Sequence, residues 1–189
     1  MKQIKIKEKE YNLIENWNEM SIGTYMKLIT LQEQKDSLVE EEFLLKFIPL
    51  ISNITEETLA NLYEEDLLLF IDSLDNFSDD LFKKEEKRHF NFNGTDYSVV
   101  IPNKLTMGEN ISIKILEKSS SNPFDTWLNL LSILVRPSTS SINEFGETIW
   151  TPEPFVGDIS ILRKRKEVLL DIPAVNAIWI IEAFTLGRK

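Results

Sequence analysis

The chain has 189 residues, of which 42% are hydrophobic and 28% charged, a balance typical of folded proteins and unlike that of disordered chains. It contains no cysteine and one histidine, which excludes disulfides, thiolate zinc sites and cysteine nucleophiles and leaves little for general-base catalysis. Of the net charge of −10, residues 1–88 carry −9, from 11 basic and 20 acidic residues, and this acidity disfavours binding to phosphate backbones.

Membrane insertion is not expected. The sequence lacks a run of about 18 apolar residues that could span a bilayer, and its N-terminus alternates charged and aliphatic residues instead of forming the apolar core of a signal peptide. We therefore expect the protein in the cytoplasm of the cell that makes it, with no membrane partner.

The first predicted element is a β-hairpin over Ile4–Ile14, where apolar and polar residues alternate on both sides of a charged turn. A second hairpin is predicted at Phe90–Val99, because the Asn-Gly pair at 93–94 suits a two-residue turn with positive φ at both positions. The two stretches correspond position by position: at an offset of 86, Phe90 matches Ile4 and Tyr97 matches Tyr11.

Helices are predicted after each hairpin from capping residues and apolar periodicity. In the first half, a helix capped by Ser21 reaches about Gln34, and others cover Glu40–Ile51, begin after Thr55 and begin near Asp66. In the second half, helices begin at the Thr106/Glu109 capping box, at Asn122-Pro123 and at Asp158, and the last covers Pro173–Leu186.

These elements predict an α+β, mainly α-helical protein built as a tandem duplication of a ββααα unit. The expected boundaries are a first acidic lobe at residues 1–82, a charged linker at 83–88 and a second lobe at 89–189. The offset between matching residues grows from 84 to 110 along the second lobe, so about 26 residues have entered it. We expect this insertion, at about 136–160, to be a loop.

The insertion is the predicted partner-binding segment. Loops longer than about 15 residues are unusual in compact domains and tend to be functional, and large aromatic side chains dominate binding hot spots. Phe145, Trp150 and Phe155, with Arg136 at the start of the segment, are the candidate contacts. The alternative is that the aromatic side chains fold back on the body of the lobe.

No catalytic, cofactor or metal site is predicted. The acidic runs read as solvated helix faces, and the glycines form no phosphate-binding motif. His89 accompanies no nucleophile motif and reads as an ordinary strand-end residue. The basic cluster Arg163–Lys166 is spread around a helix without a groove-reading motif, so nucleic-acid binding is not expected.

A family resemblance is carried by two stretches. The hairpin followed by Trp17 and Met20-Ser21-Ile22-Gly23 at a helix start, and the run WLNLLSILVRP at Trp127–Pro137, resemble the small acidic α-helical proteins of tailed-bacteriophage structural modules, often labelled tail assembly chaperones. The resemblance covers most of the chain and transfers no site. It implies a non-enzymatic morphogenesis protein that binds other phage structural proteins, in the host cytoplasm during assembly and then in the virion.

Two roles within that class remain open, and a third lies outside it. We favour a structural component of the connector, neck or tail, a homo-oligomer or ring within a larger assembly. The alternative is a tail assembly chaperone that binds the tape-measure protein transiently. The third is an anti-host regulator that acts as an acidic decoy of nucleic acid.

Overall fold

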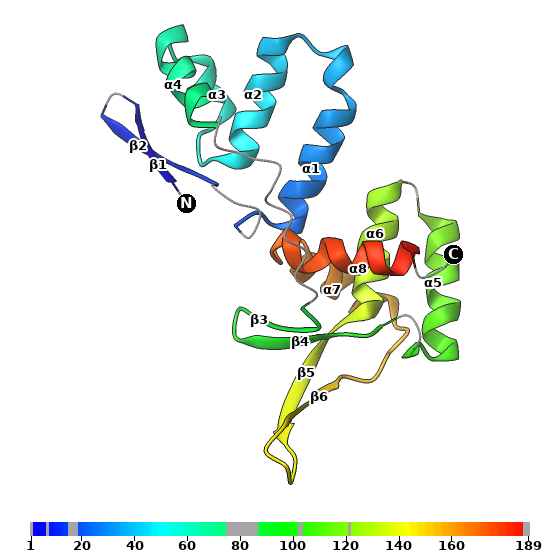
Figure 1. Cartoon of the computed structure of the whole chain (residues 1–189). Helices are drawn as coiled ribbons and strands as arrows, with labels where there is room; N and C mark the ends of the chain where they lie inside the picture. The colour runs from blue at the N-terminus through cyan, green and yellow to red at the C-terminus, as the bar shows by residue number, and fades with distance from the viewer. Residues whose placement is uncertain are drawn as a thin grey trace. The chain divides into compact units, whose positions relative to one another are not determined.

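The computed structural model describes residues 2–6, 8–14, 19–74, 87–101, 104–120 and 122–186, and it is α+β and mainly helical (Figure 1). It divides into two compact units: Met1–Lys83 with Pro173–Val175, and Lys84–Ile172 with Asn176–Lys189. Trp17 and residues 83–86 of the expected linker lie outside the described residues.

Within its described residues, the first unit is a hairpin followed by four α-helices. Ile4, Ile6, Tyr11 and Leu13 point from the hairpin into its core, as the period-2 pattern requires, and Phe70 lies fully buried among them. The elements are β1 (Lys2–Ile6), β2 (Lys9–Leu13), α1 (Ile22–Glu33), the 3-10 turn η1 (Lys35–Ser37), α2 (Glu40–Ile51), α3 (Glu56–Ala60) and α4 (Glu64–Leu74).

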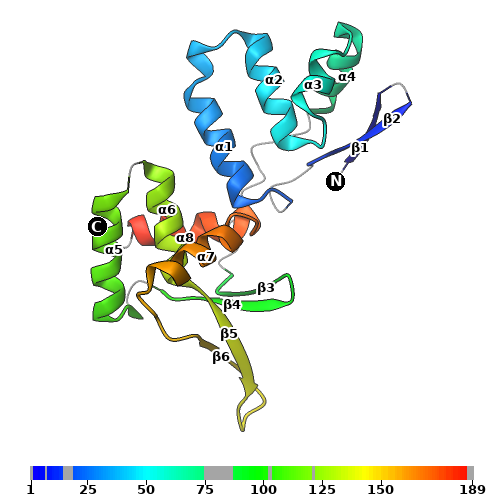
Figure 2. The same cartoon turned by 180° about the vertical axis from the view of Figure 1, so that it is seen from behind.

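The second unit has the same order of elements with one further hairpin between its second and third helices (Figure 2). Its sheet has four antiparallel strands in the order β3-β4-β5-β6. The elements are β3 (His89–Phe92), β4 (Thr95–Val99), α5 (Met107–Ser119), α6 (Pro123–Leu134), β5 (Val135–Ile142), β6 (Thr148–Pro152), α7 (Ile159–Leu169) and α8 (Ala174–Leu186), and the division between the units falls within α8.

Two sequence expectations need correction. Among the described residues, four α-helices follow each hairpin, as the capping residues and the apolar periodicity predict, and this is one more than the ββααα formula counts. The expected loop at 136–160 is mostly the β5–β6 hairpin.

The predicted helix starts are confirmed at their caps. The Oγ1 of Thr55 accepts the N–H of Thr58 at 3.2 Å, and the Oδ1 of Asn122 accepts the N–H of Asp125 at 2.9 Å. Each bond satisfies an amide that has no partner within its helix. Ser21, Thr106 and Asp158 cap α1, α5 and α7 in the same way.

The two initial hairpins share one register. Ile4 faces Tyr11 in the first and Phe90 faces Tyr97 in the second, at an offset of 86 in both strands. The predicted Asn-Gly turn is confirmed, with φ of 49° at Asn93 and 76° at Gly94.

In both units the residue after the second strand is bonded to the end of the second helix. The N–H of Ile14 donates to the carbonyl of Ile51 at 2.8 Å, and the N–H of Val100 donates to the carbonyl of Leu134 at 2.9 Å. The helix therefore ends against the open side of the hairpin in each unit.

The units differ two residues after the end of this helix. In the first, Asn53 donates its N–H to the carbonyl of Asn12 at 3.1 Å, and its side-chain oxygen accepts the N–H of Asn12 at 2.7 Å. The chain then turns toward α3. In the second, Arg136 faces Ser98 and the chain continues as β5.

Candidate protein-interaction site

The segment that we call the arm is residues 138–152, the part of β5 and β6 beyond the β4–β5 pairing. Its strands are antiparallel, with Thr139 facing Thr151 and Ile142 facing Thr148. Figures 1 and 2 show it extending away from the helices of its unit. The β-branched residues on both strands favour this pairing.

The tip of the arm is held by one asparagine. The side-chain oxygen of Asn143 accepts the N–H groups of Phe145 and Glu147 at 2.9 and 2.8 Å, and its Nδ2 donates to the Glu147 carboxylate at 2.9 Å. Its backbone accepts from Gly146, whose φ of 77° requires glycine for an unstrained turn. The tip is therefore a fixed turn.

This turn presents apolar side chains to solvent. Phe145 is 86% exposed and Ile142 is 77% exposed, and Ile149 is also exposed on β6. Glu144 and Glu147, both exposed, flank Phe145. Exposed apolar side chains on a hydrogen-bonded turn, ringed by polar groups, are the pattern of a protein-binding surface, because the backbone that carries them loses little freedom on binding.

The root of the arm contains a buried ion pair. An Nη of Arg136 lies 2.8 Å from the Glu109 carboxylate, with side chains 7% and 1% exposed. The other carboxylate oxygen of Glu109 accepts the N–H of Thr106 in the capping box of α5, and Arg136 also donates to the carbonyl of Glu153 at 2.9 Å. The pair thus joins the first residues of β5 to the start of α5.

We expected Arg136 among the partner contacts, but its side chain is buried and is not available to a partner. Burial is the largest cause acting on its pKa, which it lowers from the ordinary value, while Glu109 and Glu153 act in the opposite direction. A guanidinium stays protonated at neutral pH in proteins. Arg136 is therefore a charged, buried residue that positions the arm.

The other predicted aromatic residues lie near the root. Trp150 is half-buried and stacks on His89, with ring centroids 5.1 Å apart and planes 13° from parallel. Phe155 is half-buried beside Gly108 and Gly157. These two side chains follow the fold-back alternative, and Phe145 alone among the predicted aromatic contacts is freely presented.

His89 has two neighbours of its own. Its Nδ1 lies 2.9 Å from the hydroxyl oxygen of Ser98 across the β3–β4 pair. Burial, and secondly the charge of Arg88, lowers its pKa below the ordinary 6.5. The lowered pKa favours the neutral ring at pH 7, and stacking on the Trp150 indole and a bond to a hydroxyl both allow that form.

Each unit also has a groove between its hairpin and its third helix. The first groove is about 700 Å³ and the second about 200 Å³. Tyr11, Thr58 and Leu62 line the first, and Tyr97, Ile161 and Arg165 line the second, together with Val135 and Pro137 of β5.

Two searches over the described part of the chain gave nothing. Its side chains form no group of three or more His, Asp or Glu that could hold a metal ion. None of its helices has the length and apolar character needed to cross a bilayer.

Comparisons of the chain with protein-family models, with curated protein sequences and with solved structures gave no match.

Proposed function

We propose that this chain is a non-enzymatic structural component of a tailed-bacteriophage virion, part of its connector, neck or tail, and that it binds a neighbouring virion protein with the arm. The observation that carries the proposal is the exposed Phe145 on a turn fixed by Asn143. A fixed aromatic tip binds without the loss of freedom that ordering a loose loop requires. The sequence resemblance supplies the viral context.

The arm is suited to insertion between other proteins. It carries apolar side chains at its tip and the unpaired outer edge of β6, the last strand of the sheet order. Edge strands offer backbone N–H and carbonyl groups to a further strand, while the apolar tip fits a pocket. The root pair of Arg136 and Glu109 keeps the arm in one orientation.

We also propose that the two units are copies of one ancestral unit, a hairpin followed by four helices, with the β5–β6 hairpin added to the second copy. The common register at an offset of 86 supports this, since unrelated hairpins would agree in register and in sequence position only by coincidence. The matching bonds from Ile14 to Ile51 and from Val100 to Leu134 support it independently.

The proposed function is tested by mass spectrometry of purified particles from a phage that encodes this chain. Stoichiometric, multi-copy presence is expected. Absence from particles that need the protein for assembly would remove the structural role and favour a transient tail assembly chaperone.

The arm is tested in the same system with Phe145→Ala. The variant chain is expected to fold but to enter particles at least tenfold less well, the effect of losing a binding hot spot. Ile159→Ala is the matched control, because Ile159, like Phe145, is a highly exposed apolar residue of the second unit and it lies outside the arm. Equal incorporation of both variants would refute the role of the arm.

A further inference from the structure

One face of α5 carries three exposed aliphatic side chains in a row. Met107, Ile111 and Ile115 are 76%, 50% and 59% exposed and recur every four residues, so they form one stripe along the helix. An amphipathic surface helix normally turns such a stripe to the core, and the core contact of this helix is instead made by Ile113. The stripe is an uncovered apolar face.

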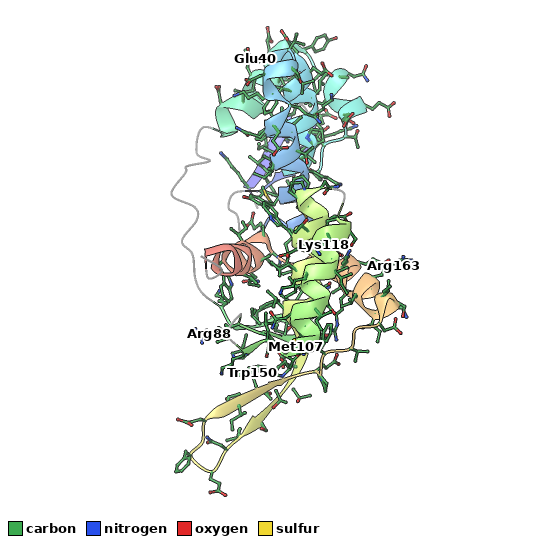
Figure 3. The ribbon with its side chains drawn as sticks, turned by 90° about the vertical axis from the view of Figure 1, so that its right-hand side faces the viewer. Glu40, Arg88, Met107, Lys118, Trp150 and Arg163 are labelled. Atoms are coloured by element: carbon green, nitrogen blue, oxygen red, sulfur yellow. The ribbon has the colours of Figure 1, made fainter. Side chains whose placement is uncertain are left out.

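Lysines accompany the stripe. Lys114 and Lys118 are exposed and stand three and seven residues after Ile111, which puts them on the same side of the helix. Figure 3 shows Met107 and Lys118 at the two ends of α5. We call the surface of Met107, Ile111, Lys114, Ile115 and Lys118 the α5 face. Its partner should be apolar and acidic.

The first unit has a helix with the opposite character. On α4, Leu68 is 51% exposed, and the exposed acids Glu65 and Asp72 stand three residues before it and four after it. We call these three residues the α4 face. It pairs an apolar centre with negative charge, as the α5 face pairs an apolar stripe with positive charge.

We propose that the α5 face of one copy of this chain binds the α4 face of a second copy. Leu68 covers the stripe near Ile111, and Glu65 and Asp72 lie against Lys114 and Lys118. This inference supplies surfaces for the homo-oligomer or ring expected from the sequence, and it depends neither on the arm nor on a viral context. The overall charges agree with it. Residues 1–88, which contain α4, carry −9 of the net charge of −10.

The two faces are different surfaces, so the contact is heterologous. Each copy keeps a free face after its first contact, and association continues until a ring closes or a filament forms. A symmetric contact of two α5 faces would stop at a dimer and would bring like charges together. The charge pattern therefore favours a head-to-tail contact.

The test uses the purified full chain and sedimentation velocity over a range of concentrations. The native chain is expected to form assemblies larger than a dimer, and raising the salt concentration is expected to weaken them. Ile111→Glu and Leu68→Lys are each expected to raise the dissociation constant at least tenfold and leave a monomer. Circular dichroism checks that both variants fold, and Ile159→Glu is the control for adding an acid at an exposed aliphatic position.

Mixing the two monomeric variants is the decisive step. The Leu68→Lys chain keeps its α5 face and the Ile111→Glu chain keeps its α4 face, so the mixture should associate through that contact although neither variant associates alone. If the native chain stays monomeric at all concentrations, the proposal is wrong. It is equally wrong if Leu68→Lys associates like the native chain, because α4 is then not the partner, or if the mixture stays monomeric.

A second pair of substitutions tests the charges separately. Lys114→Glu with Lys118→Glu keeps the apolar stripe and is expected to weaken association as Ile111→Glu does. Unchanged association of this variant would contradict the predicted α4 partner. Particle incorporation plays no part in these measurements, so failure here leaves the proposed function standing, and success does not establish it.

Discussion

The ion pair at the root of the arm makes a quantitative prediction through Arg136→Met. Methionine keeps much of the side-chain length but leaves the Glu109 carboxylate, which is 1% exposed, without its cation. Breaking a buried ion pair by removing one partner typically costs about 3–5 kcal/mol, because an uncompensated charge stays buried. That is a large part of the about 5–15 kcal/mol that stabilises an ordinary domain.

The matched rescue is Arg136→Met together with Glu109→Gln. Glutamine at the third position of the helix can still accept the N–H of Thr106, so the capping box survives while the buried charge is gone. The double variant is expected to lie within about 1.5 kcal/mol of the native chain, roughly the worth of one hydrogen bond. The control is Arg163→Met at an exposed arginine, expected to change stability by less than about 0.5 kcal/mol.

Urea unfolding followed by tryptophan fluorescence is the assay. Trp127, Trp150 and Trp179 belong to the second unit and Trp17 to the first, so the signal reports mainly the unit that contains the pair. Single and double variants are compared at pH 7 from their unfolding midpoints and slopes. If Arg136→Met is as stable as Arg163→Met, or if the second substitution restores nothing, the pair does not hold the root.

Three further outcomes are expected. Because the pKa of His89 is lowered in the folded chain, the unfolded chain binds a proton more readily, and the unfolding free energy falls as the pH drops through 6.5 toward the folded pKa. His89→Gln should remove this dependence on pH. NMR titration of this single histidine gives its pKa in the folded chain. Asn143→Ala removes three side-chain bonds and should speed hydrogen exchange at Phe145 and the other tip amides, with the core amides unchanged. Asn53→Ala leaves the N–H of Asn12 without its 2.7 Å partner and should lower the unfolding free energy of the first unit by about 0.5–1.5 kcal/mol; no loss would mean that water replaces the side chain.

Most of the fold could be predicted from signals within short stretches of the sequence. The Asn-Gly pair at 93–94 and the capping residues Ser21, Thr55 and Thr106 act through bonds within a few residues, so the sequence alone identifies them. The offset of 86 could be read from side-chain types because both strands of each hairpin bury one face. Such patterns depend on short-range geometry, so they can be recognised without knowledge of the tertiary structure.

The arm and the ion pair at its root could not be predicted from such local signals. Residues 138–141 are all Ser or Thr, and without a buried face β5 shows no apolar alternation there, so the strand reads as a loop. Arg136 meets Glu109 from 27 residues away, a contact that no local pattern encodes. The one available hint was the density of β-branched residues at 148–151 after the Asn-Glu-Phe-Gly turn.

The bond between Asn53 and Asn12 has an engineering consequence. In the first unit, two residues connect Ser52, which bridges to the hairpin, with the helix cap Thr55. In the second unit, the 22 residues 136–157 connect the equivalent positions Val135 and Asp158. Replacing those 22 residues by Asn-Ile, together with Glu109→Gln, should therefore give a folded chain with no arm. The short connection in the first unit thus shows how the connection in the second unit could be shortened.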